Sequence, residues 1–438
     1  AIWRSTRRVG LSDAVGGFQF ARRVGCRRFS TAITPLPLPA ANKLYSDTEL
    51  SEKIKAWRRP FEPGPLTRDE MEMFWDKGWV LKELFDEKDL QPSIEAIEEI
   101  VHSLAVLLVE RGLIPETFEH LPFETRLIEI ERHYPTASVW LHKQQFQMPA
   151  AFQDLWSHKE LLGCVQQMIG PYIAGHPVWN LRTKVPRFDE ATVPWHQDTA
   201  YLHEDCWTTL QPTAWVPLVD TNEKNGCLKI VETGHKSGRT AVHHCCWSNT
   251  WYTELDVDVM EGTLGVDARD QAQGGQAITV PVPKGHVLFF NNLIPHQSLN
   301  NTSDNVRWSF DFRWQDFRSP TGYDGVDAIV MQNPDAEAGF TPNWEEWSSK
   351  NAFDLRRDPV NTDSVEESQS VLASNGSHHL DTIVVGPWMQ QWEITNQNRH
   401  TEAFLQQTTK VSTTRWPKRN LDTAKEDTDA RNGSQICS

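Results

Sequence analysis

Residues 306–314 alternate between two kinds of side chain along their whole length. Every second residue is apolar or aromatic, and the residues between them are polar, namely Arg307, Ser309, Asp311 and Arg313. A two-residue period is typical of a β-strand whose two faces meet different surroundings. We expect the aromatic face to pack on helices and the polar face to line a barrel interior, where an isolated arginine needs an anionic partner.

Several other stretches also favour short strands. They are rich in β-branched and aromatic residues and are separated by turns such as Asn225-Gly226 and Lys284-Gly285. The predicted strands are residues 173–185, 194–202, 213–220, 226–233, 277–282 and 286–291. Many short strands with few helices between them predict a sandwich or a jelly roll. The predicted fold class is therefore mostly β with flanking helices (α+β).

Helices are predicted mainly before the β-rich part. Thr67 and Glu70 form a capping-box pattern, which starts a helix that Gly78 ends. Apolar periodicity predicts further helices at 85–113 and 155–169, and short ones near 344–352 and 363–373. The predicted organisation is a targeting leader at 1–33, a Pro-rich linker at 34–65, a folded domain at 66–320, a C-terminal extension or lid at 321–404 and a disordered tail at 405–438.

The charge of the chain limits the kinds of partner it can have. The formal net charge is -16, whereas nucleic-acid-binding proteins present basic faces. No apolar run approaches the roughly 20 residues that span a bilayer. We therefore expect a small-molecule substrate, no nucleic acid and no membrane span; the oligomeric state is not predicted.

The N-terminal segment differs from the rest in charge. Residues 1–46 contain eight basic residues and a single acidic one, Asp13. An Arg-rich, acid-poor composition is typical of an organellar transit peptide, which predicts a mitochondrial protein, or otherwise a cytoplasmic one. The alternative is a basic disordered arm that contacts a membrane or another protein. The seven scattered cysteines predict neither a disulfide framework nor a zinc ribbon, and the His243-His244-Cys245-Cys246 run is not expected to bind a metal.

The stretch at 194–202 carries an imidazole and a carboxylate with the spacing of metal ligands. In an extended strand, His196 and Asp198 point to the same side. They supply two of the three ligands of a 2-His-1-carboxylate iron site. His296, at the end of an apolar strand, is the preferred third ligand. His286 is its competitor, and the His203-Glu204-Asp205 stretch is a second match to the spacing that lacks the surrounding motif order.

Arg307 and Ser309 lie side by side on the polar face of the 306–314 strand. The arginine fork and the hydroxyl together suit a carboxylate ligand. The alternative is an internal ion pair between Arg307 and Asp311.

A series of motifs occurs in one order between residues 66 and 317. They are Pro194-Trp195-His196-Gln197-Asp198, Trp215-Val216-Pro217-Leu218, Asn225-Gly226-Cys227-Leu228, Glu232-Thr233-Gly234-His235-Lys236, residues 285–290, Pro295-His296 and Arg307-Trp308-Ser309. Together they resemble the phytanoyl-CoA dioxygenase family of Fe(II)- and 2-oxoglutarate-dependent oxygenases. The resemblance implies a double-stranded β-helix (jelly roll, cupin-like) core. It implies His196, Asp198, His296 and Arg307 as catalytic residues, the first three as metal ligands, and Arg307, Ser309, Gln197 and Trp215 at the cosubstrate.

The resemblance also implies a reaction. Fe(II), 2-oxoglutarate and O2 would serve as cofactor and cosubstrates, with ascorbate as a reductant, to hydroxylate a small organic or acyl substrate while 2-oxoglutarate is decarboxylated to succinate. The alternatives are a desaturase or halogenase of the same fold, or a catalytically silent ligand-binding protein. Asp198 disfavours the halogenase, because halogenases lack that carboxylate.

The substrate is not specified by the sequence. Arg182, Lys184 and Arg187 precede the metal-binding stretch, and we expect them to be solvent-exposed, with contact to an anionic substrate as the alternative. The loop at 242–276 and the segment after 319 are expected to carry the lid and the substrate selectivity.

Overall fold

The computed structural model describes residues 45–143, 148–323, 327–350 and 380–410. The predicted leader at 1–33 and the predicted helix at 363–373 lie outside these ranges. Among the described residues, no helix combines the length and the apolar character needed to cross a bilayer.

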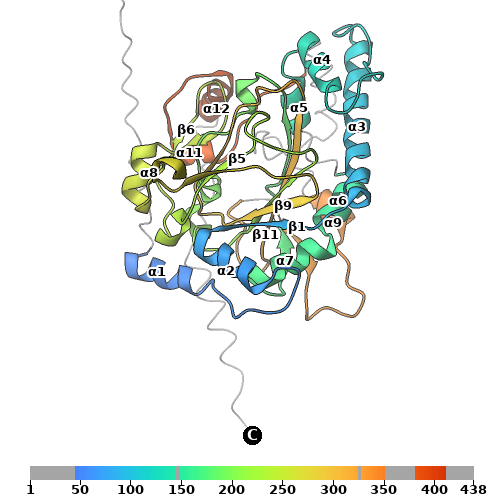
Figure 1. The fold of residues 1–438 in the computed structure, drawn as a ribbon. Coiled ribbons are helices and arrows are strands. Elements are labelled where there is room, and N and C mark those ends of the chain that lie inside the picture. Colours follow the sequence, from blue (N-terminus) through green and yellow to red (C-terminus); the bar gives the residue numbers. More distant parts are fainter. Residues whose placement is uncertain (1–44, 144–147, 324–326, 351–379, 411–438) are drawn as a thin grey trace, which may run out of the picture. The chain divides into compact units, whose positions relative to one another are not determined.

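The larger of two antiparallel sheets forms the centre of the described structure (Figure 1). Its order is β1-β9-β4-β11-β2-β12, and β3 also pairs with β11. The strands are β1 (Trp79–Glu83), β2 (Ile173–Gly175), β3 (Asn180–Lys184), β4 (Thr213–Pro217), β9 (His286–Phe290), β11 (Arg307–Asp316) and β12 (Ile329–Gln332). The predicted strand at 173–185 is thus two strands, β2 and β3, which pair with different parts of β11.

The smaller sheet faces the larger one. It has the order β10-β5-β8 and consists of β5 (Leu228–Val231), β8 (Ala277–Val280) and β10 (His296–Ser298). The chain passes back and forth between the two sheets on its way from β4 to β11. Apolar side chains from both sheets, among them Trp215, Ile230 and Leu288, form one core cluster. This arrangement is a double-stranded β-helix, and the predicted fold class is confirmed.

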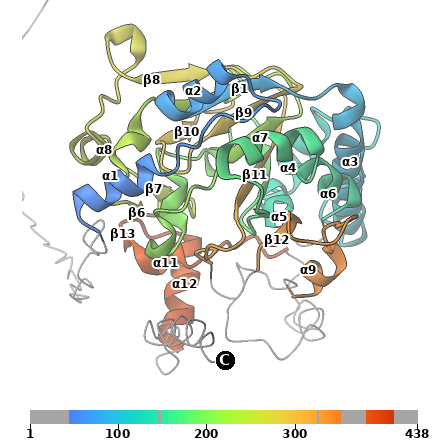
Figure 2. The same cartoon turned by 90° about the horizontal axis from the view of Figure 1, so that it is seen from below.

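Helices cover the outer face of the larger sheet. They are α2 (Arg68–Lys77), α3 (Glu87–Glu110), α4 (Arg126–His133), α5 (Ala137–Lys143), α6 (Ala150–Trp156) and α7 (Lys159–Ile169), and α3, α4 and α6 lie together on one side of β11 (Figure 2). The aromatic face of β11 packs on them as predicted: the rings of Phe152 and Phe310 lie 4.7 Å apart, and those of Trp156 and Phe312 lie 5.6 Å apart.

The helix boundaries follow local capping groups. Thr67 and Glu70 form the predicted capping box of α2, and Gly78 ends this helix with φ +91°. A Cβ at Gly78 would lie 2.6 Å from Nδ1 of His235, so the position also requires a residue without a side chain. The predicted helix at 155–169 is wrong in its extent, because helix α6 ends at Trp156 and a new helix, α7, begins at Lys159. His158 caps α7 by accepting a hydrogen bond from the Glu160 N–H.

The remaining elements are helices, 3-10 turns and a third, small sheet. They are α1 (Asp47–Lys55), α8 (Val257–Leu264), α9 (Trp344–Lys350), α11 (Trp388–Gln391), α12 (Arg399–Lys410), the 3-10 helices η1 (Asp189–Ala191), η2 (Asp198–Tyr201), η3 (Glu204–Cys206), η4 (Gly234–Ser237) and η5 (Gln271–Gln273), and a small sheet of β13 (Glu393–Ile394), β6 (His244–Cys245) and β7 (Thr253–Glu254). The predicted disordered tail is wrong for residues 405–410, which continue α12 beyond its buried His400, Thr401 and Phe404. Residues 411–438 lie outside the described residues.

Stability is expected to fall in mildly acidic solution because of His235. Burial is the main cause that lowers the pKa of His235 to about 4, and its Nε2 bonds to the Trp75 carbonyl. Between that pKa and the unfolded value near 6.5, the unfolded chain binds more protons than the folded one, so the free energy of unfolding decreases as the pH falls. When the pH is lowered from 7 to 4.5, the free energy of unfolding should fall by about 2 to 3 kcal/mol less in His235→Gln than in the wild type. Urea denaturation measures this difference. His120→Gln, a substitution at an exposed position, is the control and should follow the wild type; an equal pH dependence in all three proteins would contradict the expectation.

Candidate metal centre and active site

Two histidines that are 100 residues apart in the sequence are joined through their backbones. The His196 N–H donates to the His296 carbonyl over 3.0 Å, and the His296 N–H donates back over 2.9 Å. Each ring also bonds through Nδ1 to the carbonyl two residues earlier in the chain, that of Pro194 or Ile294. A carbonyl only accepts, so Nδ1 carries the proton in both rings and Nε2 presents a lone pair, as metal ligation requires.

Asp198 completes the group of ligands. Its Oδ1 lies 3.7 Å from Nε2 of His196 and 3.9 Å from Nε2 of His296, and the ligand atoms of all three residues lie within 4.8 Å of one another. Ligand atoms that share a metal at about 2.1 Å lie roughly 3 to 4 Å apart. All three side chains are buried. Among the described residues this is the one cluster of three or more His, Cys, Asp or Glu side chains with metal-binding spacing, and its donor set suits non-heme iron.

The local backbone differs from the predicted continuous strand. His196 lies in the bridge to His296, but Asp198 begins the 3-10 turn η2, where the Ala200 N–H donates to the Gln197 carbonyl. The prediction of a strand over 194–202 is therefore wrong: His196 forms an isolated β-bridge, and residues 198–201 form the turn. The turn nevertheless brings the carboxylate to the same side as the imidazoles.

The Asp198 carboxylate is held by groups that the sequence analysis did not single out. Nε and Nη2 of Arg313 donate to Oδ2 and Oδ1 over 3.0 and 2.8 Å, and the Thr213 hydroxyl donates to Oδ2 over 2.8 Å. Burial would raise the pKa of Asp198, but the Arg313 guanidinium holds that pKa well below its usual range. The only sequence feature that pointed to a role for Arg313 was the alternation of β11, which placed this residue on the interior face.

Arg307 is buried without a carboxylate partner among the described residues. Its Nη1 donates to the Ser309 hydroxyl over 2.6 Å, its guanidinium lies 5.2 Å from the centre of the Trp215 ring, and its Nε has no hydrogen-bond partner. Burial lowers the pKa of Arg307 to about 10, and the charge of Asp311 opposes this shift. The alternative ion pair with Asp311 is not formed, because Asp311 binds Arg182 over 2.7 Å.

The other predicted site residues occupy distinct places. The Gln197 amide donates to the carbonyls of Arg239 and Leu293 and accepts from the Ala241 N–H. Both of its N–H groups are therefore used in hydrogen bonds to the backbone of two neighbouring loops. The competing ligands lie apart from the metal-binding cluster: His286 begins β9, and the exposed His203 bonds to Asp205.

The predicted exposure of the basic residues near the metal site is partly wrong. Lys184 is fully buried and donates to the Ser298 hydroxyl over 2.7 Å, and Arg182 is largely buried against Asp311. Their strand β3 pairs with β11 and packs against α5, which leaves Lys184 buried and Arg182 with 16% of its side chain exposed. Arg187, which follows β3, is exposed as predicted.

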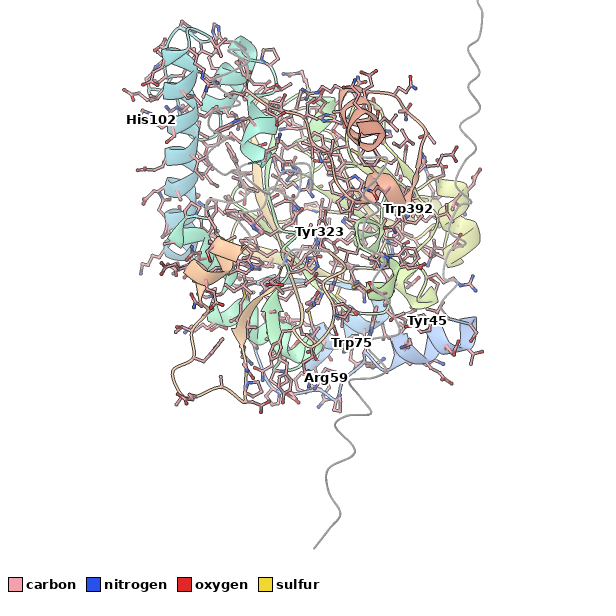
Figure 3. The ribbon with its side chains drawn as sticks, turned by 180° about the vertical axis from the view of Figure 1, so that it is seen from behind. Tyr45, Arg59, Trp75, His102, Tyr323 and Trp392 are labelled. Carbon is pink, nitrogen blue, oxygen red and sulfur yellow. A yellow bond between two sulfur atoms is a disulfide. The ribbon has the colours of Figure 1, made fainter. Side chains whose placement is uncertain are left out.

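A cavity opens from the metal-binding cluster. Its empty volume is about 730 Å³ including the part open to solvent, and it reaches His196, Asp198 and Arg313. Aromatic side chains form much of its wall, namely Tyr201, Trp251, Tyr252, Tyr323 and Trp388; Tyr323 lies near the centre of the view in Figure 3. A mostly apolar wall with a few polar groups is typical of a small-molecule site.

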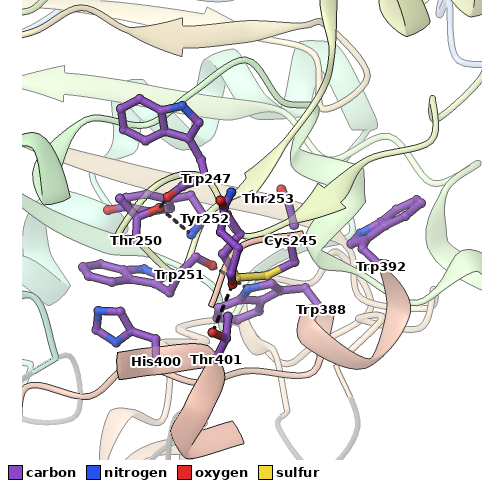
Figure 4. Close-up of a disulfide and its surroundings, with 12 residues drawn as sticks. Cys245, Trp247, Thr250, Trp251, Tyr252, Thr253, Trp388, Trp392, His400 and Thr401 are labelled. Atoms are coloured by element: carbon purple, nitrogen blue, oxygen red, sulfur yellow. Dashed lines mark hydrogen bonds between the residues drawn. A yellow bond between two sulfur atoms is a disulfide. The ribbon is translucent and has the colours of Figure 1, made fainter. Parts of the chain in front are cut away.

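The wall includes chain from far beyond the metal ligands. The Trp388 indole donates to the Trp251 carbonyl over 2.8 Å, and the Trp392 indole donates to the Ala200 carbonyl over 2.7 Å. Beside them, Cys245 and Cys246, which are neighbours in the sequence, form a disulfide that the sequence analysis did not predict (Figure 4). The Trp388 hydrogen bond and the pairing of β13 with β6 hold the C-terminal residues against the loop at 242–254.

Residues 130–309 match the family model described as phytanoyl-CoA dioxygenase (PhyH). This part of the chain is therefore similar to the phytanoyl-CoA dioxygenase family. The matched range includes the three candidate metal ligands, Arg307 and Ser309, and it ends before Arg313 and Trp388.

The chain is also similar to curated relatives and to solved structures. The chain is 25% identical over 203 residues to 1-deoxypentalenic acid 11-beta-hydroxylase of Streptomyces exfoliatus, a match that covers 43% of this chain and 65% of the relative. Similar solved structures include EctD from S. alaskensis with 2-oxoglutarate and 5-hydroxyectoine (TM-score 0.43, 11% identity, 65% of this chain and 86% of that chain). Another is the apo form of the non-heme monooxygenase ThoJ (TM-score 0.41, 19% identity, 62% of this chain and 86% of that chain).

Proposed function

We propose that the protein is an Fe(II)- and 2-oxoglutarate-dependent oxygenase that hydroxylates a small organic or acyl substrate. One observation carries the proposal: a buried 2-His-1-carboxylate cluster occurs in the same barrel as a buried arginine that has no carboxylate partner among the described residues. The cluster suits iron, and the arginine suits a dicarboxylate cosubstrate. The match to the phytanoyl-CoA dioxygenase family supports the same assignment.

Each residue has a distinct part in this function. His196, Asp198 and His296 would hold the iron, which when bound couples the oxidative decarboxylation of 2-oxoglutarate by O2 to oxidation of the substrate. Burial, the first of several causes, lowers the pKa of His296 to about 3, so this imidazole stays neutral and able to ligate at physiological pH. Arg307 and Ser309 would bind the distal carboxylate of 2-oxoglutarate by charge and hydrogen bond.

The cavity wall would orient the substrate and keep bulk water away from the reacting carbon. Its aromatic rings offer flat apolar surface, while Arg182 and Asp311 neutralise each other. The curated relatives act, by their names, on 1-deoxypentalenic acid, and the chain spans 65% of their length. We include free carboxylic acids beside branched acyl-CoA thioesters among the substrates to be tested.

The test is succinate release by the full chain with Fe(II), 2-oxoglutarate, O2 and ascorbate. Free carboxylic acids, acyl-CoA thioesters and cyclic metabolites are offered in turn, and succinate and oxidised product are measured together by mass spectrometry. We expect succinate that depends on the iron and rises with at least one substrate class. Desaturation would appear as a product two hydrogens lighter, and hydroxylation as one oxygen heavier.

A catalytically silent binding protein is the second candidate. It would bind members of the panel in the aromatic cavity without forming succinate, and it would not bind 2-oxoglutarate. That combination of results would overturn the oxygenase proposal.

A further inference from the structure

The two oxygens of the Asp198 carboxylate have different surroundings. Oδ2 accepts from the Thr213 hydroxyl over 2.8 Å and from Nε of Arg313 over 3.0 Å, which uses its two acceptor sites. Oδ1 accepts one hydrogen bond, from Nη2 of Arg313 over 2.8 Å, and faces Nε2 of both histidines. Only Oδ1 therefore keeps a lone pair for a metal.

The groups that hold Oδ2 come from one position of the larger sheet. Arg313 of β11 and Thr213 of β4 are directly paired in the sheet register. Both side chains are buried, and Nη1 of Arg313 donates to the Val178 carbonyl over 3.2 Å. A cross-strand pair in a packed sheet has little freedom to move, so the carboxylate it holds is fixed as well.

We propose that Arg313, together with Thr213, is a positioning residue that fixes Asp198 as a one-oxygen metal ligand. The inference rests on the proposed function for its choice of metal, but it concerns metal binding and not turnover. The guanidinium also compensates the buried carboxylate in the metal-free protein, where an unpaired charge would be costly. The ligand cluster is thereby assembled before a metal arrives.

Variants that conserve charge isolate the positioning role. Arg313→Lys keeps the positive charge but loses the two hydrogen bonds from one guanidinium to the carboxylate. Thr213→Val replaces the hydroxyl by a methyl group of similar volume and leaves the charge unchanged. We expect each to weaken Co(II) binding by about 10- to 100-fold, the usual effect of losing a hydrogen-bond partner of a metal ligand. The visible absorption bands of bound Co(II) should also change, because a carboxylate released at Oδ2 can bind through both oxygens.

Arg182→Lys is the matched control. Arg182 is a buried arginine on the adjacent strand, paired with Asp311 instead of with a metal ligand. We expect this variant to lose stability with unchanged Co(II) affinity and spectrum. Affinities are measured on the full chain by chelator competition, alongside thermal unfolding without metal.

The outcomes separate positioning from general structural support. Folded Arg313→Lys and Thr213→Val proteins with wild-type Co(II) affinity and spectrum would overturn the proposal, and so would an equal loss of affinity in Arg182→Lys. A wild-type chain that binds no Co(II) would overturn both this proposal and the oxygenase. Intact Co(II) binding without succinate release from any substrate would overturn the oxygenase alone.

Discussion

Replacement of Arg307 by Met is expected to remove 2-oxoglutarate binding while leaving the protein at least as stable as the wild type. Removal of one partner from a buried charged pair costs about 2 to 5 kcal/mol, so the dissociation constant for 2-oxoglutarate should rise at least about 30-fold. In the ligand-free protein, however, the guanidinium is buried, its Nε has no partner, and no carboxylate among the described residues binds it. Burial of this uncompensated charge lowers the stability of the ligand-free protein, and an apolar side chain of similar length avoids that loss.

Arg182→Met provides the contrast. This substitution leaves Asp311 buried and without its 2.7 Å ion pair, so we expect a loss of about 3 to 5 kcal/mol in the free energy of unfolding. Urea denaturation and calorimetric titration with 2-oxoglutarate, in the presence of Mn(II) and without O2, measure both quantities. If Arg307→Met lost as much stability as Arg182→Met and still bound 2-oxoglutarate, Arg307 would be a structural residue.

His296→Ala and Asp198→Ala should both abolish metal binding but should differ in stability. Loss of a ligand is expected to cost more than the 10- to 100-fold in metal affinity that loss of a ligand's hydrogen-bond partner costs. Asp198→Ala also leaves Arg313 buried and unpaired, which we expect to cost about 3 to 5 kcal/mol. His296→Ala keeps the Asp198 to Arg313 pair and should lose less.

Metal content and urea denaturation of the same preparations check this difference. His203→Ala, at the exposed second match to the ligand spacing, should keep full metal content. Metal loss in His203→Ala with metal retained in His296→Ala would place the centre at the other stretch.

The sequence predicted those features that depend on local period and on residue type. The alternation of 306–314 placed the aromatic face of β11 on helices and its polar face inside, and the structure agrees. The side chains of His196, Asp198 and His296 are also brought together as predicted. The strand period was sufficient for β11, but Asp198 reaches the two histidines from the turn η2 and not from the predicted strand.

The features that were missed depend on contacts between distant parts of the chain. The burial of Lys184 follows from the place of β3 beside β11, which no local pattern shows. The contact of Arg313 with Asp198 needs the turn η2 in place of a strand. The contribution of Trp388 to the cavity wall depends on a long-range hydrogen bond to the Trp251 carbonyl.

The backbone bridge between His196 and His296 makes metal binding a property of the completed topology. Bringing together residues that are 100 positions apart costs about 4 kcal/mol in loop-closure entropy alone, which the paired sheets must offset. A partly folded chain with correct local structure would therefore hold its ligands apart. The absorption of Co(II) bound at this centre would report closure of the barrel itself, and following its appearance during refolding would time the moment at which the two halves of the fold meet.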